Sequence, residues 1–269
     1  MTSRTDRRQK TPGAALPAAR ARYALLDELR GAALLCMVVY HAFYLLADVF
    51  HSAAGHKLQL AAAPAQPFIA GAFILISGIC SRLSRSNAKR GIKLLAAALL
   101  LTGGTYALRF FGVDELITFG VLHFLAVAIL LFAPLRRAGG KIPAAPQIVC
   151  FAALFVTTVG PFYRGQPGFG FGHAVWLRFP YTAFWPLFCL GFPSRTLDSA
   201  DYIPLIPWLF LFFAGTAVGI YARQGRFPKS WIRPRCKPLG WLGRHSLLLY
   251  LLHQPALFLL FALWRAFFG

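Results

Sequence analysis

Residues 25–50, LLDELRGAALLCMVVYHAFYLLADVF, decide how this chain folds, because they form one apolar stretch that nevertheless carries charged side chains. A run of about 18 or more apolar residues is typical of a membrane-spanning helix. Yet Asp27 and Arg30 stand at one end of the stretch, and His41 lies near the other. An ionisable side chain inside a span is costly and by default marks a functional site.

The spacing of these residues predicts a polar stripe along one helix face. Arg30 and His41 are about three helical turns apart, so they share a face at a separation of roughly 16 Å along the axis. Asp27 lies one turn before Arg30 and can pair with it. The competing interpretation is structural: the Asp27–Arg30 end could snorkel to the membrane surface, and His41 could simply hydrogen-bond a neighbouring helix.

The composition extends the membrane interpretation to the whole chain. Of 269 residues, 58% are hydrophobic and 13% are charged, whereas about a quarter of a soluble domain is charged. We therefore predict an all-α polytopic transmembrane helix bundle with about seven spans, with eight as the alternative. The predicted spans cover about residues 24–47, 68–83, 92–108, 116–135, 144–159, 203–222 and 246–268.

The charge of the chain predicts its orientation. The formal net charge is +20, from 28 basic and 8 acidic residues. Basic residues gather at 82–93, 136–141 and 223–244, and such clusters favour the cytoplasmic side. The N-terminus is then cytoplasmic, provided that residues 160–202, rich in Gly, Pro and aromatics, make no net crossing. Anionic lipids are the expected partners of the basic loops. Nucleic acid is not expected, because no basic soluble module with interleaved aromatics is visible.

The remaining segments complete the expected organisation. Residues 1–22 read as a disordered basic cytoplasmic tail, and residues 23–269 as one transmembrane domain. The outward loops are expected at about 48–67, 109–116 and 160–202. Five cysteines are scattered without metal-ligand spacing, so no metal site is expected.

Three further stretches place titratable side chains in or beside spans. TFGVLHFLA carries His123, DSADYIPLIPW carries Asp201 and Tyr202, and LGRHSLLLYLLHQP carries Arg244 and His253. Tyr250, Ser246 and His253 lie on a common face of the last helix. Repeated histidines within an apolar bundle suit proton transfer, because imidazole titrates near neutral pH.

These residues resemble the transmembrane acyltransferase superfamily. LDELRGAALLCMVVYHAF resembles the first helix of that group, with an Arg and a His eleven residues apart. FILISG, FGVLHFLA, DYIPLIPWL and GRHSLLLYLLHQP are similar to the bacterial branch related to the heparan-α-glucosaminide N-acetyltransferase catalytic domain. The resemblance extends from about Leu25 to Phe258.

The resemblance implies a multi-pass enzyme in the inner (cytoplasmic) membrane of a bacterium. It would take an acetyl group from cytoplasmic acetyl-CoA and pass it to a sugar or other small acceptor at the outer face. His41 falls where one branch has its proposed catalytic histidine. In the eukaryotic acetyltransferase that position is an asparagine and the histidine comes from the following loop, where His56 is nearest. His253 matches a histidine in the last helix of relatives.

The expected site residues follow from the stripe and the resemblance together. The expected catalytic residues are His41, as general base or transient acetyl carrier, His56 and His253. The residues expected to bind the donor are Arg30, Arg90 and Arg244. The residues expected to bind the acceptor are Asp27, His123, Asp201 and Tyr202. Two other functions stay open: a proton-coupled transporter with a histidine relay, and a catalytically silent partner of another membrane enzyme. A homo-oligomer is compatible with the sequence.

Overall fold

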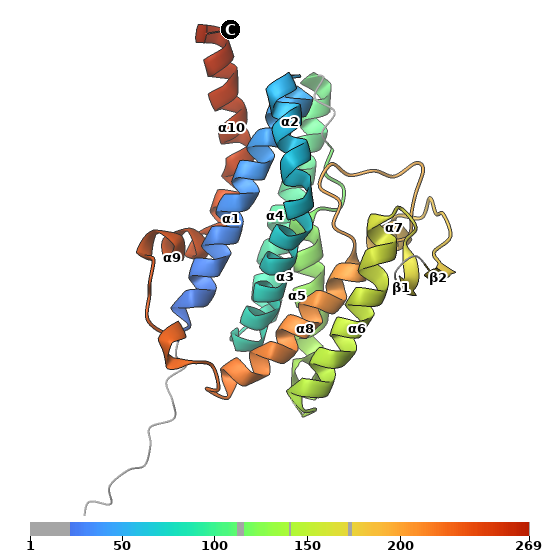
Figure 1. Cartoon of the computed structure of the whole chain (residues 1–269), viewed down its shortest axis with the longest axis vertical. Helices are drawn as coiled ribbons and strands as arrows, with labels where there is room; N and C mark the ends of the chain where they lie inside the picture. Colours follow the sequence, from blue (N-terminus) through green and yellow to red (C-terminus); the bar gives the residue numbers. More distant parts are fainter. Residues whose placement is uncertain (1–21, 112–115, 140, 172–173, 269) are drawn as a thin grey trace, which may run out of the picture.

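The apolar runs of the sequence form long helices in the computed structural model, which describes residues 22–111, 116–139, 141–171 and 174–268 (Figure 1). The long helices are α1 (Ala24–Tyr44), α3 (Gln66–Leu83), α4 (Asn87–Leu108), α5 (Val121–Gly139), α6 (Ala144–Tyr163), α8 (Leu205–Arg223) and α10 (Ser246–Phe268). The shorter elements are η1 (Leu45–Val49), α2 (Ala53–Ala62), η2 (Ala63–Ala65), η3 (Arg109–Phe111), β1 (Gly168–Phe171), β2 (Ala174–Arg178), α7 (Trp185–Leu190), η4 (Lys229–Trp231) and α9 (Lys237–Arg244).

The length and composition of these helices confirm an all-α polytopic membrane bundle. Among the described residues, six helices are long and apolar enough to cross a membrane. The remaining predicted span corresponds to α5, whose apolar part, Val121–Arg136, is shorter. The helix itself is confirmed, and its crossing as a seventh span stays a prediction.

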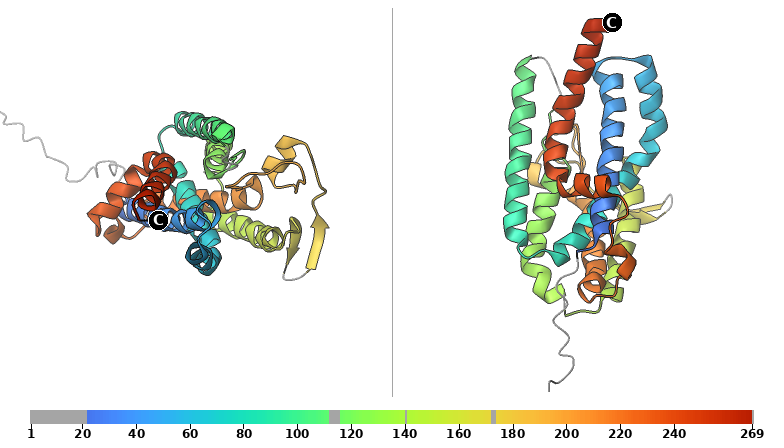
Figure 2. Two further views of the ribbon diagram at one scale, coloured as in Figure 1. Left: turned by 90° about the horizontal axis from the view of Figure 1, so that it is seen from above. Right: turned by 90° about the vertical axis from the view of Figure 1, so that its left-hand side faces the viewer.

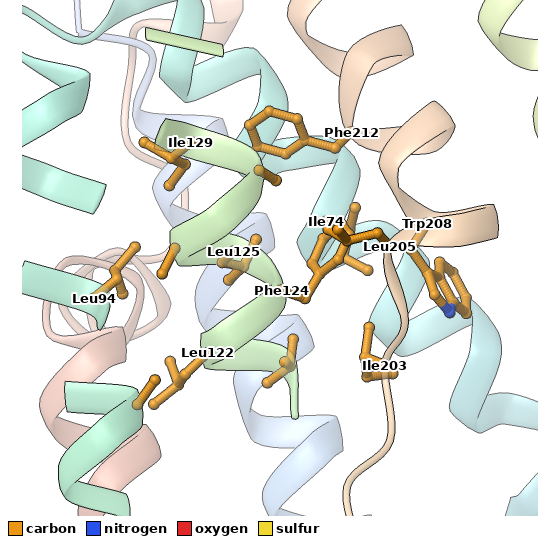
Figure 3. Packing of buried hydrophobic residues seen from close by; sticks show 14 of the residues in the cluster. Ile74, Leu94, Leu122, Phe124, Leu125, Ile129, Ile203, Leu205, Trp208 and Phe212 are labelled. Atoms are coloured by element: carbon orange, nitrogen blue, oxygen red, sulfur yellow. The ribbon is translucent and has the colours of Figure 1, made fainter. Parts of the chain in front are cut away.

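Helix α5 lies at the centre of the bundle, in contact with α3, α4 and α8 (Figures 1 and 3). Phe124 and Ile129 of α5 are fully buried, and they pack in one cluster with Trp208 and Phe212 of α8. By contrast, α6 and α10 bury little of their surface. The first turns of α5 carry apolar side chains on all sides, and a helix of this kind is stable where other helices enclose it.

The loop conformation predicted for 48–67 was wrong, because residues 53–62 form helix α2; that this segment faces outward stays a prediction. Ser52 caps this helix through its side chain, which accepts a hydrogen bond from the Gly55 N–H at 3.3 Å. Pro64 and Pro67 lie in the first turns of η2 and α3. A proline in a first turn loses no helical hydrogen bond, so these prolines continue the chain into α3 rather than breaking it.

The segment after α6 contains the β1–β2 hairpin and the short helix α7, and no described helix of spanning length. The two strands pair antiparallel, which the all-helical prediction did not include. Figure 2 places the hairpin on the side of the bundle away from α9 and α10. Two predictions fall partly outside the described residues: the disordered tail at 1–22, of which only residue 22 is described, and the outward loop at 109–116, of which 112–115 are not described.

One end of the bundle gathers the start of α1 and the ends of α3 and α8, while α10 runs to the opposite end (Figure 1). The Tyr23 hydroxyl at the start of α1 donates to the Ala222 carbonyl of α8 at 2.9 Å. The predicted basic loops at 82–93 and 223–244 adjoin this end. The arrangement brings cations from distant parts of the sequence to one place.

Candidate active site

A cavity of about 700 Å³ opens at this end of the bundle. Its walls come from helices α1, α3, α4, α5, α8, α9 and α10. Within the described residues, eight cationic side chains line it against the single carboxylate of Asp27. The cations are Arg22, Arg30, Arg82, Arg90, Lys93, Arg136, Arg223 and Arg244. This size is typical of a small-molecule site, and the charge favours an anionic ligand.

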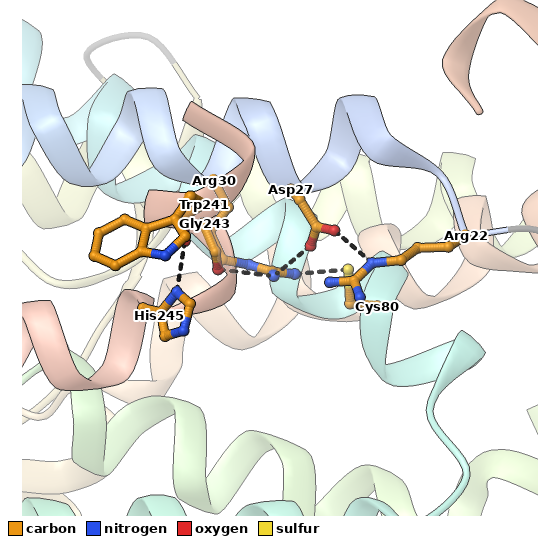
Figure 4. A network of polar contacts seen from close by, with 7 residues as sticks. All are labelled: Arg22, Asp27, Arg30, Cys80, Trp241, Gly243 and His245. Atoms are coloured by element: carbon orange, nitrogen blue, oxygen red, sulfur yellow. Dashed lines mark hydrogen bonds and ion pairs between the residues drawn. The ribbon is translucent and has the colours of Figure 1, made fainter. Parts of the chain in front are cut away.

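The predicted pair of Asp27 and Arg30 is confirmed on the wall of this cavity (Figure 4). Asp27 accepts from Arg30 Nη1 at 3.3 Å and from Arg22 Nε at 2.8 Å. Arg30 also donates from Nη2 to Cys80 Sγ at 2.8 Å and from Nη1 to the Gly243 carbonyl at 3.5 Å. The network ties α1 to α3 and α9, so Arg30 is held in place at the cavity wall.

Glu28, which directly follows Asp27 on α1, holds the start of α9 in position. It is 5% exposed, and its Oε1 accepts from the backbone N–H groups of Arg235 and Cys236 at 2.6 and 2.9 Å. These groups precede the first turn of α9, where a carboxylate is favourable. The acid that follows Asp27 therefore has a structural partner.

Gly243→Ala is expected to lower stability by separating α9 from α1. A methyl group at Gly243 would overlap the Asp27 carbonyl oxygen, and overpacking of this kind costs about 1–3 kcal/mol. Thermal unfolding of the detergent-solubilised protein measures the change. The matched control is Gly103→Ala in α4, where an added methyl meets open space. Equal melting temperatures for the two variants would contradict the expected contact.

Arg82 is a buried cation that sequence analysis placed only in a basic loop. It is 1% exposed and lines the cavity. Its Nε donates to the Thr216 carbonyl at 3.1 Å and its Nη1 to the Arg136 carbonyl at 2.8 Å. Neither ion pair found in the described part of the chain involves Arg82, and Arg136 and Arg223, which line the same cavity, are also cations. Two carbonyls solvate a buried cation without neutralising it, so the site favours an anion.

Two histidines from the first and last long helices meet in the bundle. The ring centroids of His41 on α1 and His253 on α10 lie 5.1 Å apart. Gln254 Nε2 lies 3.2 Å from His41 Nδ1. His253 Nδ1 lies 2.6 Å from the Tyr250 carbonyl oxygen. The fold thus joins two residues that the sequence separates by most of its length.

These hydrogen bonds determine which nitrogen of each neutral ring carries the proton. A carbonyl oxygen only accepts, so His253 donates from Nδ1 and its lone pair is on Nε2. An amide nitrogen only donates, so the contact of Gln254 Nε2 with His41 Nδ1 suits a His41 ring whose proton is on Nε2. His253 Nε2 is buried and has no partner among the described residues. A buried orphan acceptor is uncommon and calls for a functional explanation.

The Asp201 carboxylate is linked to the histidine pair through Tyr250 and is hydrogen-bonded at Oδ2. Its Oδ2 accepts from the Tyr250 hydroxyl at 2.8 Å and from the Val121 backbone N–H at 3.2 Å. Val121 is the first residue of α5, where the helix dipole favours a negative charge. Asp201 is therefore anchored to both α5 and α10.

His123 has both ring nitrogens engaged within the protein. Its Nδ1 accepts from the Gly120 N–H at 3.3 Å, and its Nε2 lies 3.1 Å from Thr102 Oγ1. The Thr102 hydroxyl in turn donates to the Ile117 carbonyl at 2.7 Å. These contacts favour the structural interpretation of His123.

The Tyr202 side chain also makes its contacts within the protein. Its hydroxyl donates to the Phe188 carbonyl at 2.6 Å, and its ring stacks on Phe188 at 4.4 Å. Burial raises the pKa of the Tyr202 phenol above its ordinary value, so the hydroxyl remains a donor at neutral pH. In this conformation the hydroxyl proton is not available to an acceptor.

Comparison with known proteins gives one family match. The family model described as "Heparan-alpha-glucosaminide N-acetyltransferase, catalytic" matches residues 22–255. The chain belongs to this family. Searches of curated proteins and of solved structures found no match. Membership in the family confirms the resemblance seen in the sequence and identifies a multi-pass membrane protein of an acetyltransferase family.

All the expected site residues lie inside the part that matches the heparan-alpha-glucosaminide N-acetyltransferase family. The structure brings Asp27, Arg30, Arg90 and Arg244 to one cavity. It brings His41 to His253, with Asp201 nearby. His56 stands apart, exposed in the first turn of α2.

Three residues of the candidate site were not predicted from the sequence to be functional. Arg82 looked like one more loop cation, and Gln254 carries no charge that would draw attention in an apolar run. Tyr250 was noticed only as a neighbour of His253 on the helix face. The signal that could have raised Gln254 is its place next to a histidine inside a span, where polar groups seek partners. Across the described residues, no group of three or more His, Cys, Asp or Glu could hold a metal ion.

Proposed function

We propose that this protein transfers an acetyl group from acetyl-CoA to a sugar or other small acceptor. The observation that carries the proposal is the basic cavity, because eight cations face it against one carboxylate. Coenzyme A presents a 3′-phosphate and a diphosphate, and guanidinium groups bind phosphates through paired N–H donors. Arg30, Arg90 and Arg244 are the predicted donor contacts, and Arg82 joins them on the ground of its buried charge.

The proposed orientation puts this cavity on the cytoplasmic side. The basic loops adjoin the cavity, and positive loops favour the cytoplasm. The N-terminal tail is then cytoplasmic, and residues 23–269 act as one transmembrane domain. The bacterial inner membrane is the proposed location, and anionic lipids are the proposed partners of the basic residues outside the cavity. A homo-oligomer remains compatible with this arrangement.

The proposed chemistry uses the free lone pair of His253. Nε2 takes the proton of the acceptor hydroxyl or amine as the acceptor oxygen or nitrogen bonds to the acetyl carbon. The C–S bond then breaks, and the leaving thiolate takes the proton from His253, so that the imidazole is neutral again. His41, the base proposed from sequence, carries its proton on Nε2 and would donate a hydrogen bond to the acceptor or to the developing oxyanion.

The remaining predicted residues keep more modest proposed roles. Asp201 supplies negative charge beside the imidazolium that forms on His253 during proton transfer. His123 and Tyr202 hold the loops around α5 through the contacts described above, so any part in acceptor binding would need these contacts to open. Asp27 orients Arg30. His56, on the exposed part of α2, is proposed to be dispensable.

The test is transfer of labelled acetyl from acetyl-CoA in sealed membrane vesicles that contain the protein. The acceptor panel holds glucosamine-bearing and hydroxyl-bearing sugars, and acetyl-CoA supplied on one side at a time reports the orientation. Transfer with the donor on the cytoplasmic side and the acceptor on the other is expected. Binding of neither acetyl-CoA nor coenzyme A by the folded protein would reject the proposal.

A further inference from the structure

The Tyr250 side chain lines the basic cavity and also contacts the histidine pair. Tyr250 lines the cavity, whereas His41 and His253 do not. The Tyr250 ring is 7% exposed, and its centroid lies 5.4 Å from that of His253. A thioester that enters the cavity therefore meets Tyr250 before it meets the histidines.

The Tyr250 hydroxyl is hydrogen-bonded to the segment around Asp201, and backbone hydrogen bonds hold that segment in place. It donates to Asp201 Oδ2 at 2.8 Å. The chain around Asp201 is bound to the segment before α5, because Ala200 N–H donates to the Leu116 carbonyl at 3.0 Å and Ile203 N–H donates to the Phe119 carbonyl at 3.3 Å. A hydrogen bond to a carboxylate is stronger than a neutral one. The ring is thus held across the inner end of the cavity.

We propose that Tyr250, anchored by Asp201, is a positioning residue that seals the cavity from the histidine pair until the acyl arm of the donor displaces it. This inference rests on the proposed function, since it assigns the cavity to acetyl-CoA. Sealing matters because water activated by the histidine base would hydrolyse a bound thioester when no acceptor is present. In this hydrolysis, the water oxygen bonds to the acetyl carbon, the C–S bond breaks, one water proton goes to the thiolate, and acetate releases the other to solvent.

Thiol labelling tests the seal without any need for activity. Cys80 lines the cavity. It is kept in every variant, because its labelling shows that the reagent has entered the cavity. A second reporter, His41→Cys, lies beyond Tyr250, and the remaining cysteines are replaced by serine: Cys36, Cys150, Cys189 and Cys236. An anionic, membrane-impermeant methanethiosulfonate is added from the cavity side, where the basic wall attracts it.

Cys80 is expected to react in every background, whereas the cysteine at 41 is expected to react slowly while Tyr250 is present. Tyr250→Ala should raise labelling at 41 by at least about tenfold, because loss of the ring opens the path and populates accessible states. Tyr250→Phe keeps the ring volume and removes the hydrogen bond, so an intermediate rate of labelling at 41 is expected. If Tyr250→Ala does not fold, Tyr250→Phe takes its place in the comparison. Equal labelling at 41 with and without the tyrosine would overturn the inference.

Activity provides a second readout that simple damage to the fold would not produce. In Tyr250→Phe, hydrolysis of acetyl-CoA without acceptor should rise about tenfold relative to transfer, as expected for loss of one hydrogen bond to a charged group. Structural damage would lower both rates together, and an unchanged ratio would contradict the seal. If the unchanged protein turns over no acetyl-CoA, the proposed function fails, while the labelling result still decides whether Tyr250 closes the cavity.

Discussion

Replacing His253 by asparagine is expected to reduce acetyl transfer by about 10²- to 10⁴-fold, the usual contribution of a general base. The asparagine amide can still donate to the Tyr250 carbonyl, as His253 Nδ1 does at 2.6 Å. What it lacks is the buried, unpartnered lone pair of Nε2. The change therefore removes the proposed base and keeps the local hydrogen bond. Initial rates of labelled acetyl transfer in vesicles, corrected for the amount of folded protein, measure the effect.

Two matched variants make this result specific. His41→Asn keeps an acceptor for the Gln254 amide, which lies 3.2 Å from His41 Nδ1, so a smaller loss of about tenfold is expected for one missing hydrogen-bond donor. His56→Asn changes an exposed histidine on α2 and should leave the rate unchanged. A severe loss in His56→Asn with near-normal transfer in His253→Asn would instead support a catalytic histidine from the segment after the first helix.

Replacing Arg82 by glutamine is expected to weaken coenzyme A binding by about 10- to 100-fold, the effect of losing one charge-assisted contact to phosphate. Arg82 is 1% exposed, and neither ion pair in the described part of the chain includes it. Its own charge is thus unbalanced until an anion enters the cavity. The glutamine amide can still donate to one of the two backbone carbonyls, so the fold should be retained. Titration calorimetry of the detergent-solubilised protein with coenzyme A gives the dissociation constant.

The control for this change is Arg85→Gln, three residues along the chain. Arg85 is exposed and is not part of the cavity lining, so the same loss of charge should leave affinity nearly unchanged. Coenzyme A should also raise the melting temperature of the unchanged protein and of Arg85→Gln more than that of Arg82→Gln, because a ligand stabilises the state that binds it. Equal affinities in the two variants would show that Arg82 does not meet the ligand.

Local patterns in the sequence predicted the features that depend on neighbours along the chain. The pairing of Asp27 with Arg30 needs only one helical turn, and it is present at 3.3 Å. Patterns failed where one signal has two meanings. A loop was expected at 48–67, but the prolines there, Pro64 and Pro67, also suit the first turn of a helix, and the chain around them is helical.

The site depended on contacts that no local pattern contains. The buried lone pair of His253 follows from its contact with Tyr250 and from the absence of any partner for Nε2 among the described residues. Arg82 looked like a cytoplasmic loop cation, and only packing against α5 and α8 buries it. His56 and His253 were equal candidates in the sequence, and the structure placed one on an exposed helix and the other beside His41.

By itself, the sequence determined a polytopic helical membrane protein and the end of the bundle where positive charge collects. It could do so because apolar length and charge act locally, and each span can be judged alone. Only the tertiary structure decided that α5 is the central helix and that cations from several helices line one cavity. It also decided that Tyr250 both lines this cavity and packs against His253. These features arise from how helices pack, and packing depends on side chains that meet from distant parts of the chain.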